Sequence, residues 1–435
     1  MVRRRNPSTA RRGVVSLTDT PRIGASLFWS LGNQVTSSAT SFVLTLYLVH
    51  TLAPSEFGLF GIGIAVILFY GGVGNALFLT QMVVHTPDKP PEDRPTFARQ
   101  MFLLVIAFCG ATILAAGTLM IALSFLWPAA NHHLGYGLVV LIAAVVYLLK
   151  EFLIRHSYVV RREDWALTLN LGNAAAIALL LLTIYGLHAL LTVERALSIY
   201  ALGQVAALLI GYRLTGLSLQ RVSWANLFSN FQLCWLDGRW ALGGVSVTWL
   251  QSQAYVYLGA AILGSAGVGH ANAARLFVAP FLMLIPAVNQ LAMPRLSSVR
   301  VRDSNKVSRY GLLITLAMLA LAVLYMLVLW LCMNQLADAL LGRKYSNVDA
   351  LVGMWCLVLL AQIARNGAAL VLQTLKQFRI LTLLNSLTAI IGVSATGLFA
   401  WSNGVTGAIL GTAVGELSLA YLLWRSVERR ESTPH

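Results

Sequence analysis

The stretch GVGHANAARLFVAPFLMLIPAVNQLAMP, Gly267–Pro294, is apolar, about as long as a bilayer is thick, and contains one charge, Arg275. A charge inside a membrane span costs roughly 2.5 kcal/mol or more, so its side chain should face a partner, a cavity or a substrate. Pro280 and Pro286 should bend a helix here. A bend leaves backbone groups without hydrogen-bond partners, and in a membrane such a helix is stable only when it packs among other helices. A bent, polar-faced helix with one arginine is typical of a transport path.

The composition of the 435-residue chain is far more apolar than that of a soluble protein. Hydrophobic residues make up 58% and charged residues 11%, and the mean hydropathy is +0.73. Soluble globular proteins carry about 25% charged residues. The sequence therefore predicts an all-α polytopic membrane protein. The net charge of +15 would suggest nucleic acid in a soluble chain, but almost all of these charges fall between apolar runs, which argues against a nucleic-acid partner.

Twelve apolar runs are long enough to cross a bilayer, which takes ~20 helical residues. They cover 23–49, 58–84, 100–126, 136–156, 166–188, 194–214, 239–262, 267–293, 309–335, 349–372, 380–401 and 404–424.

Lysine and arginine fall mostly on one side of these runs. With the N-terminus inside, 27 of the 31 lie in or beside the cytoplasmic segments, whereas the outside loops hold only Arg195, Arg343 and Lys344. This bias follows the positive-inside rule and predicts that both termini are cytoplasmic.

The runs divide the chain into five predicted parts. They are a basic cytoplasmic tail 1–22, a six-helix lobe 23–214, a cytoplasmic connector 215–238, a second six-helix lobe 239–424 and a tail 425–435. The connector should be an amphipathic helix at the membrane surface, because large apolar side chains recur in it at helical spacing.

A weak internal repeat relates the two predicted lobes. Three pairs of segments recur in the same order at a nearly constant offset: LAPSEFGLFGIGIAVILF from Leu52 with LGSAGVGHANAARLFVAPF from Leu263, LTLN at 167–170 with LTLLN at 381–385, and ALSIYALGQVAALLIGYR from Ala196 with AILGTAVGELSLAYLLWR from Ala408. The order predicts parallel repeats about an axis along the membrane normal.

Arg275 is the leading candidate for substrate contact. On a helical wheel, Asn272, Arg275, Leu282, Pro286 and Asn289 fall on one side, which suits the wall of a cavity. The alternative is a structural arginine whose side chain reaches the outer membrane surface.

Lys150 and Arg365 occupy matching places in the two halves. Such a pair of cations would flank a central anion site, or would instead reach lipid phosphates at the cytoplasmic face. Lys150 also has Glu151 and Glu163 nearby to neutralise it.

Three further polar residues are candidates. Glu416 is the one carboxylate deep in a predicted span; it would couple transport to protons or sodium, or form an internal hydrogen bond between helices. Gln251 and Asn33 lie on polar helix faces, which would contact glycan and water or hold helices together.

The sequence lacks the usual signatures of an enzyme or an ATP-driven pump. It has no recognisable nucleophile motif, no glycine-rich phosphate loop and no metal spacing among its four cysteines. We therefore expect a carrier that is not an enzyme and needs no cofactor, driven by a proton or sodium gradient if it is driven at all.

Several segments resemble the polysaccharide exporters of the multidrug/oligosaccharidyl-lipid/polysaccharide (MOP) superfamily. LAPSEFGLFGIGIAV from Leu52 is similar to the LGPxEFGLY-like opening of that family. The segment from Trp249 to Pro280 with PRLSSV after it resembles the start of its second half, and GVTGAILGTAVGELSLAYLLW from Gly404 its final helix.

The resemblance implies two six-helix lobes in a V around a central, often cationic cavity. It implies a flippase that moves undecaprenyl-diphosphate-linked oligosaccharides across the bacterial cytoplasmic membrane by alternating access, for surface polysaccharides such as exopolysaccharide or O-antigen. Membrane lipids, a polysaccharide polymerase and chain-length machinery would be its partners. A pyrophosphate-binding clamp formed by both lobes cannot be mapped onto this sequence, because the repeat aligns Arg275 with Ile64 and Asn272 with Gly61.

Two other functions compete with this interpretation. A cation-coupled multidrug antiporter of the same superfamily would need acidic residues deep in the first lobe, where Glu56, Glu151 and Glu194 all lie near span ends. A membrane glycan polymerase or ligase would usually need a large outside loop, and the longest one predicted here has about a dozen residues.

Overall fold

A computed structural model describes residues 20–126, 134–217, 223–303, 305–341, 344–345 and 348–431. Most of the predicted N-terminal tail, residues 218–222 of the predicted connector and the last four residues lie outside these ranges.

The described elements are all helical, as predicted. They are α1 (Thr20–Thr51), α2 (Pro54–Gly74), the π-helix η2 (Asn75–Leu79), α3 (Thr80–His85), α4 (Arg94–Leu126), α5 (Leu134–Val159), α6 (Glu163–Gly186), α7 (Val193–Thr215), α8 (Trp224–Ser252), α9 (Ala254–Arg275), α10 (Ala279–Leu282), α11 (Leu284–Arg302), α12 (Asn305–Leu331), α13 (Met333–Leu341), α14 (Val348–Thr374) and α15 (Phe378–Glu431).

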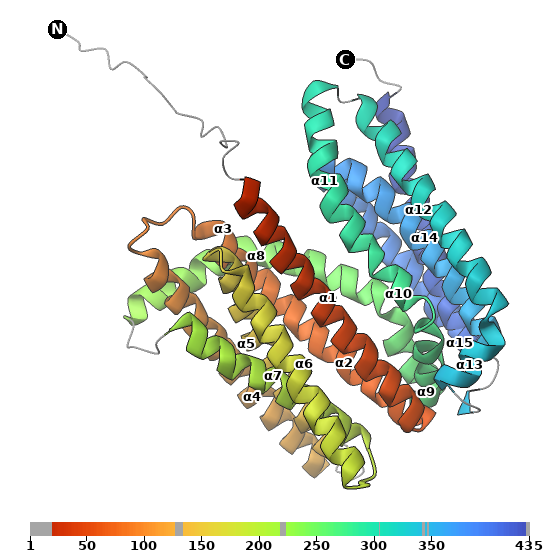
Figure 1. Ribbon diagram of the computed structural model, residues 1–435, viewed down its shortest axis with the longest axis horizontal. Helices are drawn as coiled ribbons and strands as arrows, with labels where there is room; N and C mark the ends of the chain where they lie inside the picture. The colour runs from red at the N-terminus through yellow and green to blue at the C-terminus, as the bar shows by residue number, and fades with distance from the viewer. Residues whose placement is uncertain are drawn as a thin grey trace.

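The helices form two lobes arranged as a V. One lobe contains α1 to α7 and the other α10 to α15, and the two converge near α9 and diverge between α1 and α11 (Figure 1). The beginning of α1 and the end of α15 lie at the open end of the V. The chain is thus a multi-pass membrane protein with the two-lobed architecture that the sequence predicts.

Two of the long helical elements are hairpins. Gly264 interrupts α9 at φ 74° and Gly404 interrupts α15 at φ 64°, a backbone region that other residues adopt only with strain. The two arms of α15 pack closely, because a side chain at Gly411 would meet the backbone of Thr396. Each glycine therefore turns the chain back across the membrane.

In the described residues, eight helical segments are long and apolar enough to cross a membrane, or nine if one bent pair is counted as a single span. The predicted twelve spans exceed this number for two reasons. The element α15 contains two predicted spans in one hairpin, and α1 and α8 are long helices rich in serine, threonine, asparagine and glutamine.

The predicted connector is not separate from the seventh span. Helix α8 begins at Trp224 and runs without a break to Ser252. Its first half is attached to the N-terminal lobe by hydrogen bonds from Asn230 Nδ2 to Gln100 Oε1 (2.6 Å) and between His85 and Asp237 (3.1 Å). Its far end packs on α15 of the other lobe, so α8 bridges the two lobes (Figure 1).

The stretch 267–294 is interrupted, as its two prolines predict. Helix α9 ends at Arg275, and the backbone N–H groups of Leu276, Phe277 and Val278 bond to carbonyls three residues earlier instead of four. Pro280 and Pro286 lie in the first turns of α10 and α11, where a missing backbone N–H costs no intrahelical hydrogen bond.

The lobes meet at a backbone-to-backbone crossing of α2 and α9. Gly58 and Gly269 are both buried there. A β-carbon on Gly58 would collide with the carbonyl of Ser265, and one on Gly269 with the carbonyl of Pro54. This crossing needs glycine on both sides because any side chain would push the helices apart.

Other contacts close the same end of the V. Lys344 Nζ donates to the backbone carbonyls of His50 (2.6 Å) and Thr51 (3.3 Å) at the end of α1. Its charge suits the negative end of the helix dipole. Leu48, Leu52 and Phe57 join residues of α9 and α14 in one buried apolar cluster.

Replacing Gly269 with alanine should loosen this closed end. The added methyl group overpacks the crossing, which typically costs about 1–3 kcal/mol, so a Thr45→Cys reporter on the cavity wall should react faster with an impermeant maleimide added on the side of the closed end. Thermal unfolding in detergent should also occur earlier. Gly110→Ala is the matched control, since nothing lies within 4 Å of that position; equal labelling of both variants would contradict the prediction.

Candidate functional site

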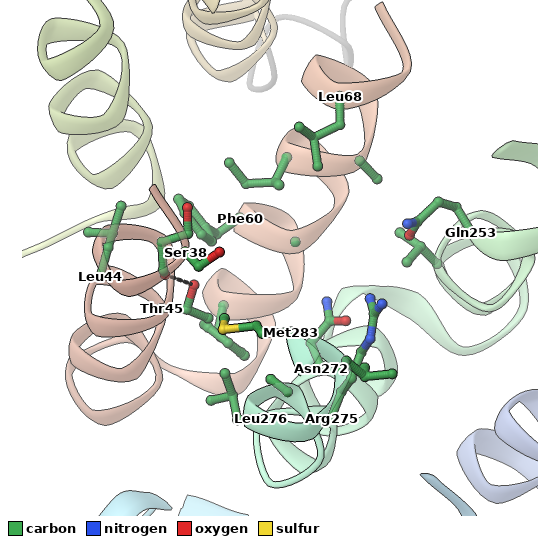
Figure 2. A pocket seen from close by; sticks show the side chains of 18 of the residues that line it. Ser38, Leu44, Thr45, Phe60, Leu68, Gln253, Asn272, Arg275, Leu276 and Met283 are labelled. Atoms are coloured by element: carbon green, nitrogen blue, oxygen red, sulfur yellow. Dashed lines mark hydrogen bonds between the residues drawn. The ribbon is translucent and has the colours of Figure 1, made fainter. Parts of the chain in front are cut away.

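A cavity of about 480 Å³ lies between the lobes. Helices α1 and α2 form one wall, and α9, α10 and the start of α11 form the other. Ser38 and Thr45 of α1 face it across from Met283, and Phe60 and Leu68 line it from α2 (Figure 2). Phe57 and Gly61 of α2 line this cavity on either side of Gly58, so the Gly58–Gly269 crossing closes one end of it.

Arg275 and Asn272 lie side by side on the C-terminal wall and point into the cavity (Figure 2). The structure therefore brings together the two residues that the sequence ranks first. Arg275 is the only charged side chain among the described residues that line the cavity. Pro286 also lines it, but Asn289 does not, because the break after Arg275 rotates it toward Asn366 of α14 (3.0 Å).

The guanidinium of Arg275 is held by aromatic groups and not by a carboxylate. Its Nη1 donates to the Tyr255 hydroxyl at 2.9 Å, and its charge lies 5.8 Å from the ring centre of Tyr255 and 5.4 Å from that of Trp355. Cation–π contacts of this kind are worth about 0.5–2 kcal/mol. None of the ion pairs among the described residues includes Arg275, so its positive charge is uncompensated.

Lys150 and Asn33 lie inside the N-terminal lobe and not on the central cavity. Lys150 is buried, forms an ion pair with Glu151 (3.1 Å) and donates to Asn170 Oδ1 (3.4 Å). Asn170 in turn donates to Asn33 Oδ1 (2.7 Å), and Asn33 donates to the Tyr158 hydroxyl (3.0 Å). These hydrogen bonds connect α1, α5 and α6. They also pair polar side chains that would be costly to leave without hydrogen-bond partners in a membrane.

The ammonium group of Lys150 is nevertheless close to the central cavity. It lines a smaller cavity of about 160 Å³ together with Glu151 and Gln204. The two cavities share the lining residues Ser41, Leu44, Leu68 and Tyr200. The ion pair of Lys150 and Glu151 therefore lies directly behind the wall of the central cavity.

Arg365 and Glu416 form an ion pair inside the C-terminal lobe. Arg365 Nε lies 3.0 Å from Glu416 Oε2, and Gln362 Nε2 donates to Glu416 Oε1 at 3.3 Å. The Arg365 N–H is not aligned for a hydrogen bond, so attraction between charges accounts for the approach. The carboxylate is buried while the side chain of Arg365 is 31% exposed.

Gln251 is buried between helices rather than on the cavity wall. Its side chain lies beside the close crossing of the two arms of α15 at Gly392 and Gly415. Its Nε2 has no hydrogen-bond partner among the described residues. The next glutamine of the chain, Gln253, lies at the break before α9 and lines the central cavity.

Tyr255 and Trp355 are the functional neighbours that sequence reasoning missed. Tyr255 is 17 residues from Asn272, and only the hairpin at Gly264 brings the two together. Trp355 reaches the site from α14 by donating its indole N–H to the Ala271 carbonyl at 2.8 Å. For Tyr255, one feature of the sequence indicated a polar environment: it closely follows the polar run Gln251–Gln253.

No protein-family model and no curated protein matches the chain, but its structure is similar to solved transporters over nearly its whole length. A multidrug resistance MATE family transporter of the MOP superfamily, inward-facing, superposes with a TM-score of 0.69 at 14% identity, covering 92% of this chain and 94% of that one. The lipid II flippase MurJ, inward closed, gives 0.68 at 12% identity, covering 92% and 87%. The chain has the same fold as these MOP-superfamily transporters.

The arrangement of the two lobes can be compared with solved structures of MATE transporters in two states. An outward-facing structure of a MATE family transporter of the MOP superfamily gives a TM-score of 0.61 at 15% identity, covering 94% of this chain and 96% of that one. The score for the inward-facing structure is higher, at 0.69. The V of this MOP fold therefore matches the inward-facing form better.

The Arg365–Glu416 pair of this MOP fold can be tested by a double-mutant cycle. Arg365→Gln should destabilise the protein by about 3 kcal/mol, because removing one partner leaves a buried charge uncompensated. Adding Glu416→Gln should restore most of that loss, since the amide keeps a polar contact with Gln362 and carries no charge. The measurement is chemical or thermal unfolding in detergent, and strictly additive losses would contradict the pairing.

Proposed function

We propose that the protein is a flippase that moves undecaprenyl-diphosphate-linked oligosaccharide units across the cytoplasmic membrane by alternating access. The observation that carries the proposal is the uncompensated charge of Arg275 on the wall of a cavity between two lobes. The MurJ neighbour, described as a lipid II flippase, supports a lipid-linked substrate.

The charge of the cavity favours an anionic substrate. Among the described residues that line it, one is basic and none is acidic. A guanidinium binds phosphate groups with two parallel, charge-assisted hydrogen bonds. Four of the five N–H donors of Arg275 remain for such a ligand, since only one is used by Tyr255.

The position of the cavity suits the head group of an amphipathic molecule. Its volume of about 480 Å³ falls within the ~300–1,000 Å³ of sites for drug-sized ligands. It lies between α1 and α11, which diverge toward the open end of the V (Figure 1). The diphosphate would bind at Arg275 and Asn272 while the hydrocarbon chain extends between the diverging helices into the bilayer.

Charge and shape together support one direction of transport. The positive-inside bias predicts that both termini, and with them the open end of the V, lie in the cytoplasm. Substrate would enter from that side and leave when the α2–α9 crossing opens outward. We propose the bacterial inner membrane as the site of this cycle, with a polysaccharide polymerase and chain-length machinery acting afterwards.

Glu416 is the proposed coupling residue. A proton that neutralised its carboxylate would release Arg365, whose side chain is the more exposed of the pair. A proton gradient would then act through the C-terminal lobe, as would sodium held by the same carboxylate. Lys150, Arg365, Gln251 and Asn33 act within this proposal as supports of the lobes behind the cavity wall.

Arg275→Ala should abolish flipping and Arg275→Lys should retain part of it, because lysine keeps the charge but loses the paired donors. The measurement is flipping by purified protein in proteoliposomes that contain a fluorescent undecaprenyl-diphosphate-linked oligosaccharide, scored by its accessibility outside. Arg213→Ala, at the exposed end of α7, is the matched control. Normal flipping by Arg275→Ala at normal protein abundance would refute the role of Arg275.

A deletion strain tests the proposed function in the cell. We expect lipid-linked glycan intermediates to accumulate on the inner leaflet and surface glycan to be lost. Normal surface glycan in a clean deletion would refute the flippase function. Efflux of cationic dyes by the purified protein would instead favour the multidrug antiporter, for which the described cavity wall offers no carboxylate.

A further inference from the structure

The hydroxyl of Tyr255 occupies the centre of a three-residue relay. It accepts a hydrogen bond from Arg275 Nη1 at 2.9 Å and donates one to Asn272 Oδ1 at 2.9 Å. A phenol has only one proton to give and a guanidinium can only donate. The direction of both bonds is therefore fixed, and the carbonyl of the Asn272 amide must face Tyr255.

The ring of Tyr255 is held rigidly. It is buried, with 2% of its surface exposed, and contacts Trp355 edge to face with ring centres 5.0 Å apart. Trp355 is equally buried and is itself anchored to the Ala271 carbonyl at 2.8 Å. The hydroxyl of Tyr255 thus has a fixed position against which the long, flexible arginine side chain can be ordered.

The relay extends to the other lobe. With its carbonyl directed at Tyr255, the Asn272 amide presents its NH₂ group to Gly61 of α2, where a β-carbon would collide with Nδ2. Gly61 lies one helical turn from Gly58, the glycine of the α2–α9 crossing. Arg275 is therefore connected through two side chains to the contact that keeps the lobes together.

We propose that Tyr255 is a positioning residue that orders Arg275 toward the cavity and links it, through Asn272, to the contact between the lobes. The proposal rests on the function proposed above for its substrate, but the ordering of Arg275 is a property of the protein alone. The hydroxyl uses a single N–H of Arg275, so it orients the guanidinium without competing with an anion.

The test is Tyr255→Phe, which keeps the ring and removes only the hydroxyl. Without a ligand, the rate at which phenylglyoxal modifies Arg275, followed by mass spectrometry, should rise several-fold because the guanidinium loses its anchor. Tyr136→Phe is the matched control: it removes a hydroxyl that also donates a hydrogen bond, to the Leu59 carbonyl at 2.7 Å, but that lies off the central cavity. An unchanged rate in Tyr255→Phe would overturn the proposal.

Binding of undecaprenyl diphosphate to the purified full-length protein provides the second measurement. Tyr255→Phe should weaken it on the order of ten-fold, as expected for loss of a hydrogen bond to a charged group, and should have no further effect in an Arg275→Ala background. Equal losses in both backgrounds would overturn the positioning role. Wild-type protein that binds no undecaprenyl diphosphate would refute the proposed function, and the modification rate would still decide the role of Tyr255.

Discussion

The close crossing of α2 and α9 at Gly58 and Gly269 is the contact on which the rest of the structure depends. It is the place where the two lobes touch backbone to backbone, and it holds one end of the V shut. The lobes converge here and diverge elsewhere (Figure 1), and a cavity lies between them next to the crossing. Two hydrogen atoms in place of side chains are what allow this approach, since helices in lipid associate mainly through such close packing.

The helix that makes this crossing also sets the environment of Arg275. Helix α9 ends at Arg275 itself, so the guanidinium emerges at the break in the chain and turns into the cavity. An intramembrane charge is expensive unless it is solvated or paired. Here the rings of Tyr255 and Trp355 and the cavity replace a carboxylate, which leaves the charge available to a ligand.

The internal repeat is visible in the charged centres of the lobes, although its chemistry differs between them. The repeat aligns Lys150 with Arg365 and Gln204 with Glu416. In the C-terminal lobe these positions form the ion pair, whereas in the N-terminal lobe Lys150 pairs with the adjacent Glu151 and shares a cavity with Gln204. Sequence reasoning identified Arg365 and Glu416 separately but did not pair them, because the two residues lie on different helices.

Apolar periodicity, charge bias and the two prolines were sufficient to predict an all-helical membrane protein with a bent helix at 267–294, because these features depend on local sequence and on the bilayer. The two lobes were predicted from the internal repeat and from the resemblance to the polysaccharide exporters. The same information placed Arg275 and Asn272 on one helix face. Tertiary structure alone decided that Tyr255 meets both of them, that Asn289 turns away, and that Gln251 and Arg365 lie inside a lobe. The geometry around Arg275 depends on the hairpin at Gly264 and the break after Arg275, which change the direction of the chain by amounts that helical periodicity does not contain.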